Sequence, residues 1–174
     1  MEEPHVTRTV TRKIPLEFIH IKSPIEGVKK KLDETLNIWN ESLQGVMESY
    51  SKVAIKDNKA RILDEYGYLL VTVEYTGEYF IPKIGQKMKG KVTTISPDQI
   101  ALLVDGVFNA VIPKDNAGPW KYKEENWKLG GRNLEQNDEI KFVVQKIEVQ
   151  SEYMLIVGQI PVEVEAPKKK PRHH

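Results

Sequence analysis

Apolar and polar residues alternate at the start of the chain, which predicts a half-buried strand over residues 6–21. Side chains of one parity share one face of a strand, so the apolar members of this run would face a core. They are Val6, Val10, Ile14, Leu16 and Phe18.

A helix is predicted next, because Ser23, Pro24 and Glu26 form a start signal. Ser23 would be the N-cap residue, proline suits the first helical position, and Glu26 would complete a capping box with Ser23. Apolar residues then recur at helical spacing, at Ile25, Val28, Leu32, Leu36 and Trp39. This spacing extends the predicted helix through Trp39, and Gly45 either ends the helical region or bends the start of the next strand.

Three more extended segments follow in the first half, at residues 46–55, 60–63 and 68–75. Turns are expected at Asp57-Asn58 and at residues 65–67, and residues 78–82 form a short extended exit. The resulting order is β-α-β-β-β. We therefore expect residues 1–84 to form an α+β domain in which a single helix packs on an antiparallel sheet.

The second half contains two β-branched, apolar runs that meet at Asp105-Gly106. Asp and Gly tolerate the positive φ that both central positions of a two-residue type I′ turn require, so this dipeptide predicts a tight hairpin. The strands are predicted at residues 87–95, 99–104, 107–113, 139–149 and 153–160. Such a strand order, with an insertion at residues 114–135 after the third strand, is the layout of an all-β, S1-like OB-fold barrel. We expect this domain to span residues 85–160, and residues 161–174 to form a disordered basic tail.

Composition removes several classes of function. The chain has 174 residues and no cysteine, which excludes disulfides, thiolate metal sites and cysteine nucleophiles. No apolar run approaches the roughly 18 residues of a membrane span, so we expect an intracellular protein without membrane contact. The residues suggest no Ser/His/Asp triad, carboxylate pair or metal cluster. We therefore expect no catalytic residues, no metal and no cofactor.

Charge is unevenly placed along the chain. Four of its 26 basic residues follow the last acidic residue, Glu165, and the other 22 are outnumbered by 25 acidic residues. These four are Lys168, Lys169, Lys170 and Arg172. They resemble a nuclear localisation segment, and a solvated basic tail is an equally good interpretation. Because the rest of the chain is slightly acidic, any contact with nucleic acid must depend on a local basic patch.

Candidate RNA-binding residues fall in two places. The insertion interleaves cations with aromatic rings, a composition suited to single-stranded nucleic acid because rings stack on bases and cations meet phosphates. Its candidates are Lys114, Trp120, Lys121, Tyr122, Lys123, Trp127, Lys128 and Arg132. The alternative is that both tryptophans anchor the insertion on the barrel and the lysines are merely solvated. The predicted barrel strands add Lys87, Lys89 and Lys91, which alternate on one face, and Phe108, which either stacks on a base or packs in the core.

One motif is a false lead. Residues 85–92 nearly match the phosphate-binding pattern G-x-x-x-x-G-K-[ST], but Val92 stands where the magnesium-binding hydroxyl is needed. A strand is also predicted where the phosphate-binding helix should begin. We therefore interpret this segment as the start of a strand and expect no nucleotide there.

Three segments together resemble a known family. They are residues 41–50 (ESLQGVMESY), 85–92 (GQKMKGKV) and 103–114 (LVDGVFNAVIPK). In this order and spacing they look like the large stalk subunit of eukaryotic RNA polymerase I, the forty-three-kilodalton class. That class is related to the stalk subunits of polymerases II and III and of archaeal polymerase. The resemblance covers residues 6–160.

The resemblance implies a non-catalytic role in ribosomal RNA transcription, in the nucleus and nucleolus. The N-terminal domain would be a tip that docks on the polymerase I core, beside a smaller stalk subunit. The OB-fold domain would lie near nascent RNA, and the subunit would contact the polymerase I initiation factor. Ile100-Ala101 stands where S1-type barrels tend to carry an RNA-stacking aromatic residue, so RNA contact is expected to be weak. The alternative is a free-standing OB/S1-type factor that binds single-stranded RNA without a polymerase.

Overall fold

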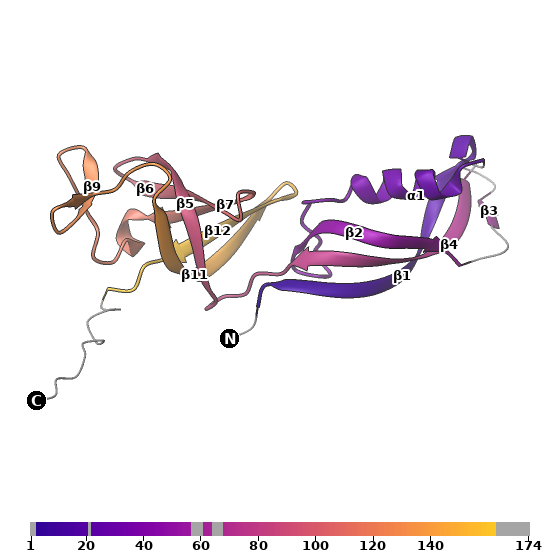
Figure 1. Cartoon of the computed structure of the whole chain (residues 1–174), viewed down its shortest axis with the longest axis horizontal. Coiled ribbons are helices and arrows are strands. Elements are labelled where there is room, and N and C mark those ends of the chain that lie inside the picture. Colours follow the sequence, from indigo (N-terminus) through magenta and orange to yellow (C-terminus); the bar gives the residue numbers. More distant parts are fainter. Residues whose placement is uncertain (1–2, 21, 57–60, 64–67, 163–174) are drawn as a thin grey trace, which may run out of the picture. The chain divides into compact units, whose positions relative to one another are not determined.

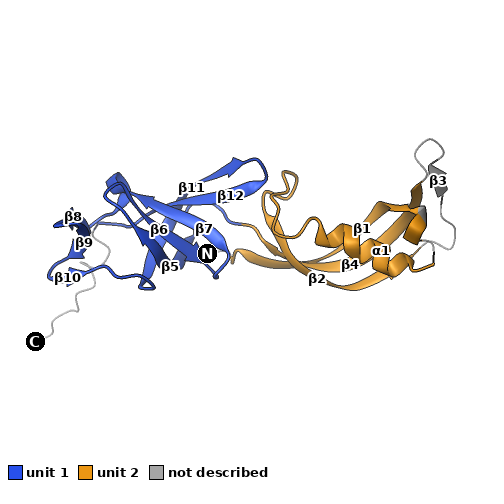
Figure 2. Ribbon diagram, turned by 90° about the horizontal axis from the view of Figure 1, so that it is seen from above, with its two compact units in different colours: residues 1–2, 82–174 blue, residues 3–81 orange. Residues whose placement is uncertain are grey.

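The computed structural model describes residues 3–20, 22–56, 61–63 and 68–162. The chain divides into two compact units, residues 3–81 and the part that begins at Pro82 (Figure 2). The turns expected at Asp57-Asn58 and at residues 65–67 lie outside the described residues, as does the basic tail from residue 163 onward. Within the part of the chain that is described, no helix has the length and apolarity needed to cross a membrane.

An antiparallel sheet forms the first unit (Figure 1). Its central strand is β4 (Tyr68–Phe80), which pairs along its whole length with β1 (His5–Glu17). On its other side β4 pairs with β2 (Val46–Ile55) and with the short β3 (Arg61–Leu63). The single helix and the β-rich sheet are consistent with the expected α+β domain. The first strand is shorter than predicted, because the chain turns into a 3₁₀ helix, η1 (Phe18–His20).

The predicted helix is correct in its start and wrong in its length and capping. Helix α1 (Pro24–Asp33) begins after Ser23, but the Ser23 side chain makes no capping hydrogen bond. The helix is only ten residues long, and Leu36 forms a β-bridge with Met47. Asn37 adopts a φ of 59°, which asparagine tolerates, and its N–H donates to the Met47 carbonyl at 2.8 Å. Leu36 and Trp39 therefore lie outside the helix, although their spacing is helical.

Helix α1 covers one face of this sheet. Val28 and Leu32 of the helix have no exposed surface, and they belong to one core cluster with Ile14, Val71 and Val73 of the strands. Removing this apolar surface from water is the main stabilising contribution to the unit. Tyr75 and Tyr79 extend the cluster along β4 and are each 3% exposed.

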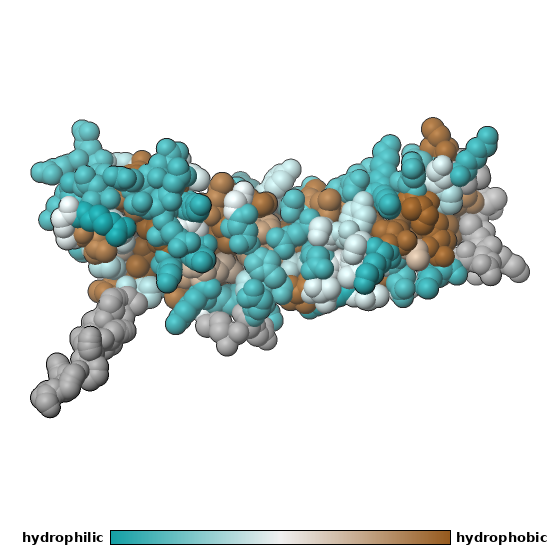
Figure 3. All heavy atoms as spheres, viewed as in Figure 1, coloured by the Kyte–Doolittle hydropathy of each residue, from teal (hydrophilic) through white to brown (hydrophobic). Residues whose placement is uncertain are grey.

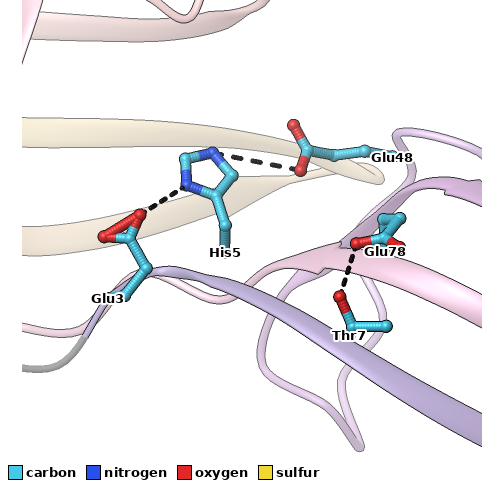
Figure 4. A network of polar contacts seen from close by, with 5 residues as sticks. All are labelled: Glu3, His5, Thr7, Glu48 and Glu78. Atoms are coloured by element: carbon cyan, nitrogen blue, oxygen red, sulfur yellow. Dashed lines mark hydrogen bonds and ion pairs between the residues drawn. The ribbon is translucent and has the colours of Figure 1, made fainter.

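Polar contacts tie the start of β1 to its neighbours (Figure 4). The ring of His5 lies between two carboxylates, 3.3 Å from Glu3 and 4.0 Å from Glu48 of β2. The Thr7 hydroxyl donates a hydrogen bond of 2.7 Å to Glu78 of β4. All these groups are close to solvent, so they contribute to the alignment of the strands more than to stability.

The second unit contains a closed five-stranded barrel, as expected, in the order β11-β12-β7-β6-β5. Its strands are β5 (Lys87–Ile95), β6 (Gln99–Val104), β7 (Phe108–Pro113), β11 (Glu139–Gln150) and β12 (Tyr153–Gln159). The pairing of β12 with β7 is parallel, and the other neighbours in the barrel are antiparallel. Antiparallel pairing of β11 with β5 closes the ring. The interior is filled by alternate residues of each strand, including Val92, Ile100, Ile112 and Ile156, none of which has measurable exposure.

The tight hairpin forms at Asp105-Gly106, but its register differs from the predicted one. Asp105 and Gly106 have φ values of 57° and 72°, so both take the positive φ that the turn requires. Val104, however, pairs with Phe108, which leaves three residues between the paired positions and not two. Val107 is consequently outside the ladder and 52% exposed.

The insertion between β7 and β11 has a sheet of its own, which the sequence reading missed. After the 3₁₀ helix η2 (Lys114–Asn116), strands β8 (Lys121–Lys123), β9 (Asn126–Leu129) and β10 (Arg132–Asn133) pair in the order β10-β9-β8. Glu124 and Glu125 make the turn between β8 and β9 with φ values of 53° and 67°. Non-glycine residues seldom adopt such values, so local sequence did not indicate a turn here.

We expect Gly158→Ala to destabilise the barrel by about 1–3 kcal/mol, because it overfills a packed interior. A Cβ at Gly158 would lie 2.4 Å from Phe142 Cδ2 and 2.9 Å from Ile112 Cδ1. The matched control is Gly131→Ala, since a Cβ at Gly131 meets no atom within 4 Å. Urea denaturation followed by the fluorescence of buried Trp127 measures both. Equal stability of the two variants would contradict the packing described here.

Burial, followed by the neighbouring Tyr75, raises the pKa of Tyr79 from 10.0 to about 12. Between these values the unfolded chain loses the phenol proton and the folded chain keeps it, so the free energy of unfolding should fall as pH rises from 10 to 12. Below pH 10 the phenol is neutral in both states and contributes no dependence. Tyr79→Phe should reduce this alkaline loss, measured by urea denaturation across the pH range. An unchanged pH profile in the variant would exclude Tyr79 as its source.

Candidate nucleic-acid interface

A row of lysines lies on the outer face of β5. Lys87, Lys89 and Lys91 are exposed and alternate with inward-facing Met88 and Gly90, as the sequence predicted. Close packing of β5 against β6 explains the glycine, because a Cβ at Gly90 would lie 3.0 Å from the Leu103 carbonyl oxygen. The strand begins soon after Gly85, so no helix N-terminus is available to bind phosphate at the motif that resembles a phosphate loop.

The neighbouring strand β11 modifies the charge of this row. Glu139 lies opposite Lys91 in the strand register and places its carboxylate 3.7 Å from the ammonium group of Lys89. Lys141 lies directly opposite Lys89 and adds a fourth exposed cation, which the sequence reading missed. The signal was present, because Lys141 alternates with Ile140 and Phe142, which face the interior.

Burial removes three aromatic candidates from the expected RNA contacts. Phe108, Trp120 and Trp127 are 5%, 7% and 1% exposed, so none offers a free ring face to a base. The Trp127 indole N–H donates to the Ser96 carbonyl at 2.8 Å, in the loop between β5 and β6. The two tryptophans therefore anchor the insertion, which was the alternative interpretation. Tyr122 is half-buried and meets the ring of Trp127 edge-on at a centroid distance of 5.6 Å.

The basic side chains of the insertion differ in the contacts that they make within the protein. Arg132 lies 5.5 Å above the Trp120 ring and 4.0 Å from Asp138. Lys128 donates a 2.7 Å hydrogen bond to Asn133 and lies 3.6 Å from Glu124. By contrast, three other lysines are exposed and have no ion pair among the described residues; they are Lys114, Lys121 and Lys123.

One exposed aromatic residue was not predicted from the sequence as a candidate. Tyr153 begins β12 and is 66% exposed, while its neighbour Met154 faces the interior and is 8% exposed. Alternation along the strand would have placed Tyr153 outside, as it did for the lysines. The candidate localisation residues, Lys168, Lys169, Lys170 and Arg172, lie outside the described part of the chain.

This arrangement suits weak electrostatic contact with a polyanion. The exposed lysines of β5, β11 and the insertion supply positive charge, but acidic groups are interspersed among them and the buried rings supply no stacking. Hydrophilic residues cover most of the barrel face that Figure 3 shows, with apolar residues scattered between them. A surface of this kind favours contact with phosphates without selection of bases.

Comparison with known proteins agrees with the barrel. Residues 82–157 match a family model described as the RPA43 OB domain in RNA Pol I. The chain is 31% identical over 137 residues to DNA-directed RNA polymerase I subunit RPA43 of Homo sapiens, a match that covers 79% of this chain and 39% of the human protein. It is 24% identical over 150 residues to the subunit of the same name from Schizosaccharomyces pombe, covering 81% of this chain and 87% of that relative.

The chain spans about two fifths of the length of its human and mouse relatives, the mouse match being 30% identical over 140 residues. The matches nevertheless include both units, since 79% to 81% of the chain is aligned. The barrel unit therefore matches the RPA43 OB domain, and both units are similar to RNA polymerase I subunits named RPA43.

Proposed function

We propose that the protein is a non-catalytic stalk subunit of DNA-dependent RNA polymerase I, acting in ribosomal RNA transcription in the nucleus and nucleolus. The observation that carries this proposal is the five-stranded barrel, whose residues 82–157 match the RPA43 OB domain. Relatives that align with most of the chain are named as subunits of that polymerase. On this proposal, phosphodiester chemistry belongs to other subunits of the complex.

A smaller stalk subunit is proposed to bind along the side of the protein, and the first unit, residues 3–81, is proposed as the tip that docks on the polymerase core. Its support is the sheet face that α1 leaves uncovered, on which β4 presents the polar residues Thr72, Glu74, Thr76 and Glu78. A polar, only partly exposed face of this kind suits a partner that itself supplies polar contacts. Contact with the polymerase I initiation factor is proposed for the whole subunit and is assigned to no particular residues.

Nascent RNA is proposed as a weak ligand of the barrel. The exposed lysines would contact phosphates, while the buried rings of Phe108, Trp120 and Trp127 would contribute no stacking. Few phosphate contacts mean low affinity, and because these contacts are electrostatic the affinity falls further as salt rises. On this proposal, RNA passes along the surface of the protein and is bound there only weakly.

We expect the full chain to bind single-stranded RNA with little base preference, with a log–log salt slope of about −0.7 for each phosphate neutralised. Lys89→Ala/Lys91→Ala should make the slope shallower by about 0.7 for each lysine that contacts a phosphate. The matched control is Lys29→Ala/Lys30→Ala, which removes the same charge from exposed positions of α1. Fluorescence anisotropy at several salt concentrations measures the slopes. Tight, base-specific binding that ignores salt would contradict the proposal.

Native affinity purification of the tagged chain, followed by mass spectrometry, tests the assembly. We expect polymerase I core subunits and one small stalk subunit to co-purify with it, because relatives named as subunits of that polymerase align with both units. An unrelated tagged protein from the same cells is the control. Recovery of RNA without polymerase subunits would instead support a free-standing OB/S1-type RNA-binding factor.

A further inference from the structure

A groove of about 520 Å³ lies on the barrel beside the end of β12. Its charged rim consists of Lys87 and Lys89 from β5 and Lys141 from β11, and Val143, Ile160 and Pro161 also line it. Met88 and Phe142 complete the lining from within the barrel wall. We call this the basic groove. Apart from the lysine ammonium groups, every side chain that lines it is apolar.

The charges on the rim are unfavourably arranged in the free protein. Lys89 and Lys141 occupy directly opposite positions of an antiparallel pair, where like charges destabilise a sheet. Glu139, at 3.7 Å from Lys89, is the carboxylate that compensates one of them. Lys87 and Lys141 have no ion pair among the described residues. The groove therefore presents excess positive charge that an acidic ligand would neutralise.

The apolar lining discriminates between two kinds of acidic ligand. The side chain of Phe142 is only 2% exposed, so its ring offers no face on which a nucleic-acid base could stack. Val143 and Pro161, which are half-buried, instead provide aliphatic surface, and lysine stems extend it below their charged ends. Burying aliphatic side chains against such a surface is favourable for a peptide, and ribose-phosphate chains carry none.

We propose that the basic groove binds an extended peptide segment of another protein in which acidic residues flank apolar ones. Apolar side chains of the peptide lie against Val143 and Pro161, and its carboxylates meet Lys87, Lys89 and Lys141. Both strands that form the rim are already paired with each other here, so recognition works through side chains and not through addition of a strand. This inference goes beyond the proposed function and does not depend on it.

The test measures binding of a fluorescent peptide that alternates glutamate and valine to the full chain, by anisotropy at low salt. Lys87→Glu/Lys141→Glu should weaken binding about tenfold, because it removes two charge pairs and adds two repulsions. Lys121→Glu/Lys123→Glu makes the same charge change at exposed positions of the insertion and should leave affinity within about twofold. Equal losses in the two variants would overturn the proposal, since they would indicate attraction by net charge alone.

Two probe variants separate the charged and apolar contributions. A peptide with glutamine in place of glutamate, and one with serine in place of valine, should each bind at least about fivefold more weakly. Equal binding of the glutamine peptide or the serine peptide would contradict the respective contact. Milder Lys87→Gln/Lys141→Gln substitutions, expected to cost about threefold, guard against misfolding of the charge-reversed chain. In methyl NMR, the resonances of Val143 should shift on titration, and unshifted resonances would place the peptide elsewhere.

Other occupants of the groove give distinct results. Oligouridine should not displace the peptide at salt concentrations where the peptide binds. The proposal fails if oligouridine does displace it and if Lys87→Glu/Lys141→Glu, but not Lys121→Glu/Lys123→Glu, weakens oligouridine binding. The groove would then be an RNA site. The chain's own Glu163 and Glu165 flank an apolar residue soon after Pro161. If Glu163→Gln/Glu165→Gln strengthens peptide binding, the groove is occupied from within the chain and the proposal of an external partner fails.

Discussion

Pairing of β11 with β5 is the interaction on which the barrel depends. It joins Glu139–Val143 to Lys87–Lys91, segments far apart in the sequence, and it turns an open row of strands into a ring without exposed edges. Backbone hydrogen bonds prolong it, since the Val92 N–H donates to the Asp138 carbonyl at 2.9 Å and the Asn137 N–H to the Val92 carbonyl at 2.8 Å. The same pairing brings Lys141 beside Lys89. Closure of the fold and the positive rim of the basic groove therefore have one origin.

Two buried tryptophans of the barrel unit, Trp120 and Trp127, hold the insertion in place. Trp127 is buried, its indole N–H reaches the loop after β5, and the backbone of Leu134 returns to it with a 2.9 Å hydrogen bond. Asn116 performs a similar role at the other end, with its amide donating to Gln145 of β11 at 2.6 Å and to the Gly158 carbonyl of β12 at 3.1 Å. A structural use of these groups leaves charge as the main means of contact with a polyanion, which agrees with a weak, salt-dependent RNA ligand.

The proposed role in the stalk is that of a scaffold, and the physical properties of this chain suit it. Two separately packed cores, one around α1 and one inside the barrel, give rigid surfaces whose side chains point outward at known positions of each strand. The lysines of β5 then belong to two proposed binding surfaces, one for RNA phosphates and one for a peptide, and the two ligands require different groups. Phosphates need only their charge, whereas a peptide in the basic groove also needs the aliphatic side chains next to them.

The sequence alone determined most of what depends on neighbouring residues. Alternation placed the barrel strands and the outward lysines, and Asp105-Gly106 predicted the hairpin because the required φ is a local property. Tertiary structure decided the rest. Leu36 has helical spacing yet bridges to Met47, and Val107 leaves the ladder because register depends on the partner strand. Burial of Trp127 and the pairing of Lys89 with Lys141 arise from contacts between distant segments, whose free energy no local pattern records.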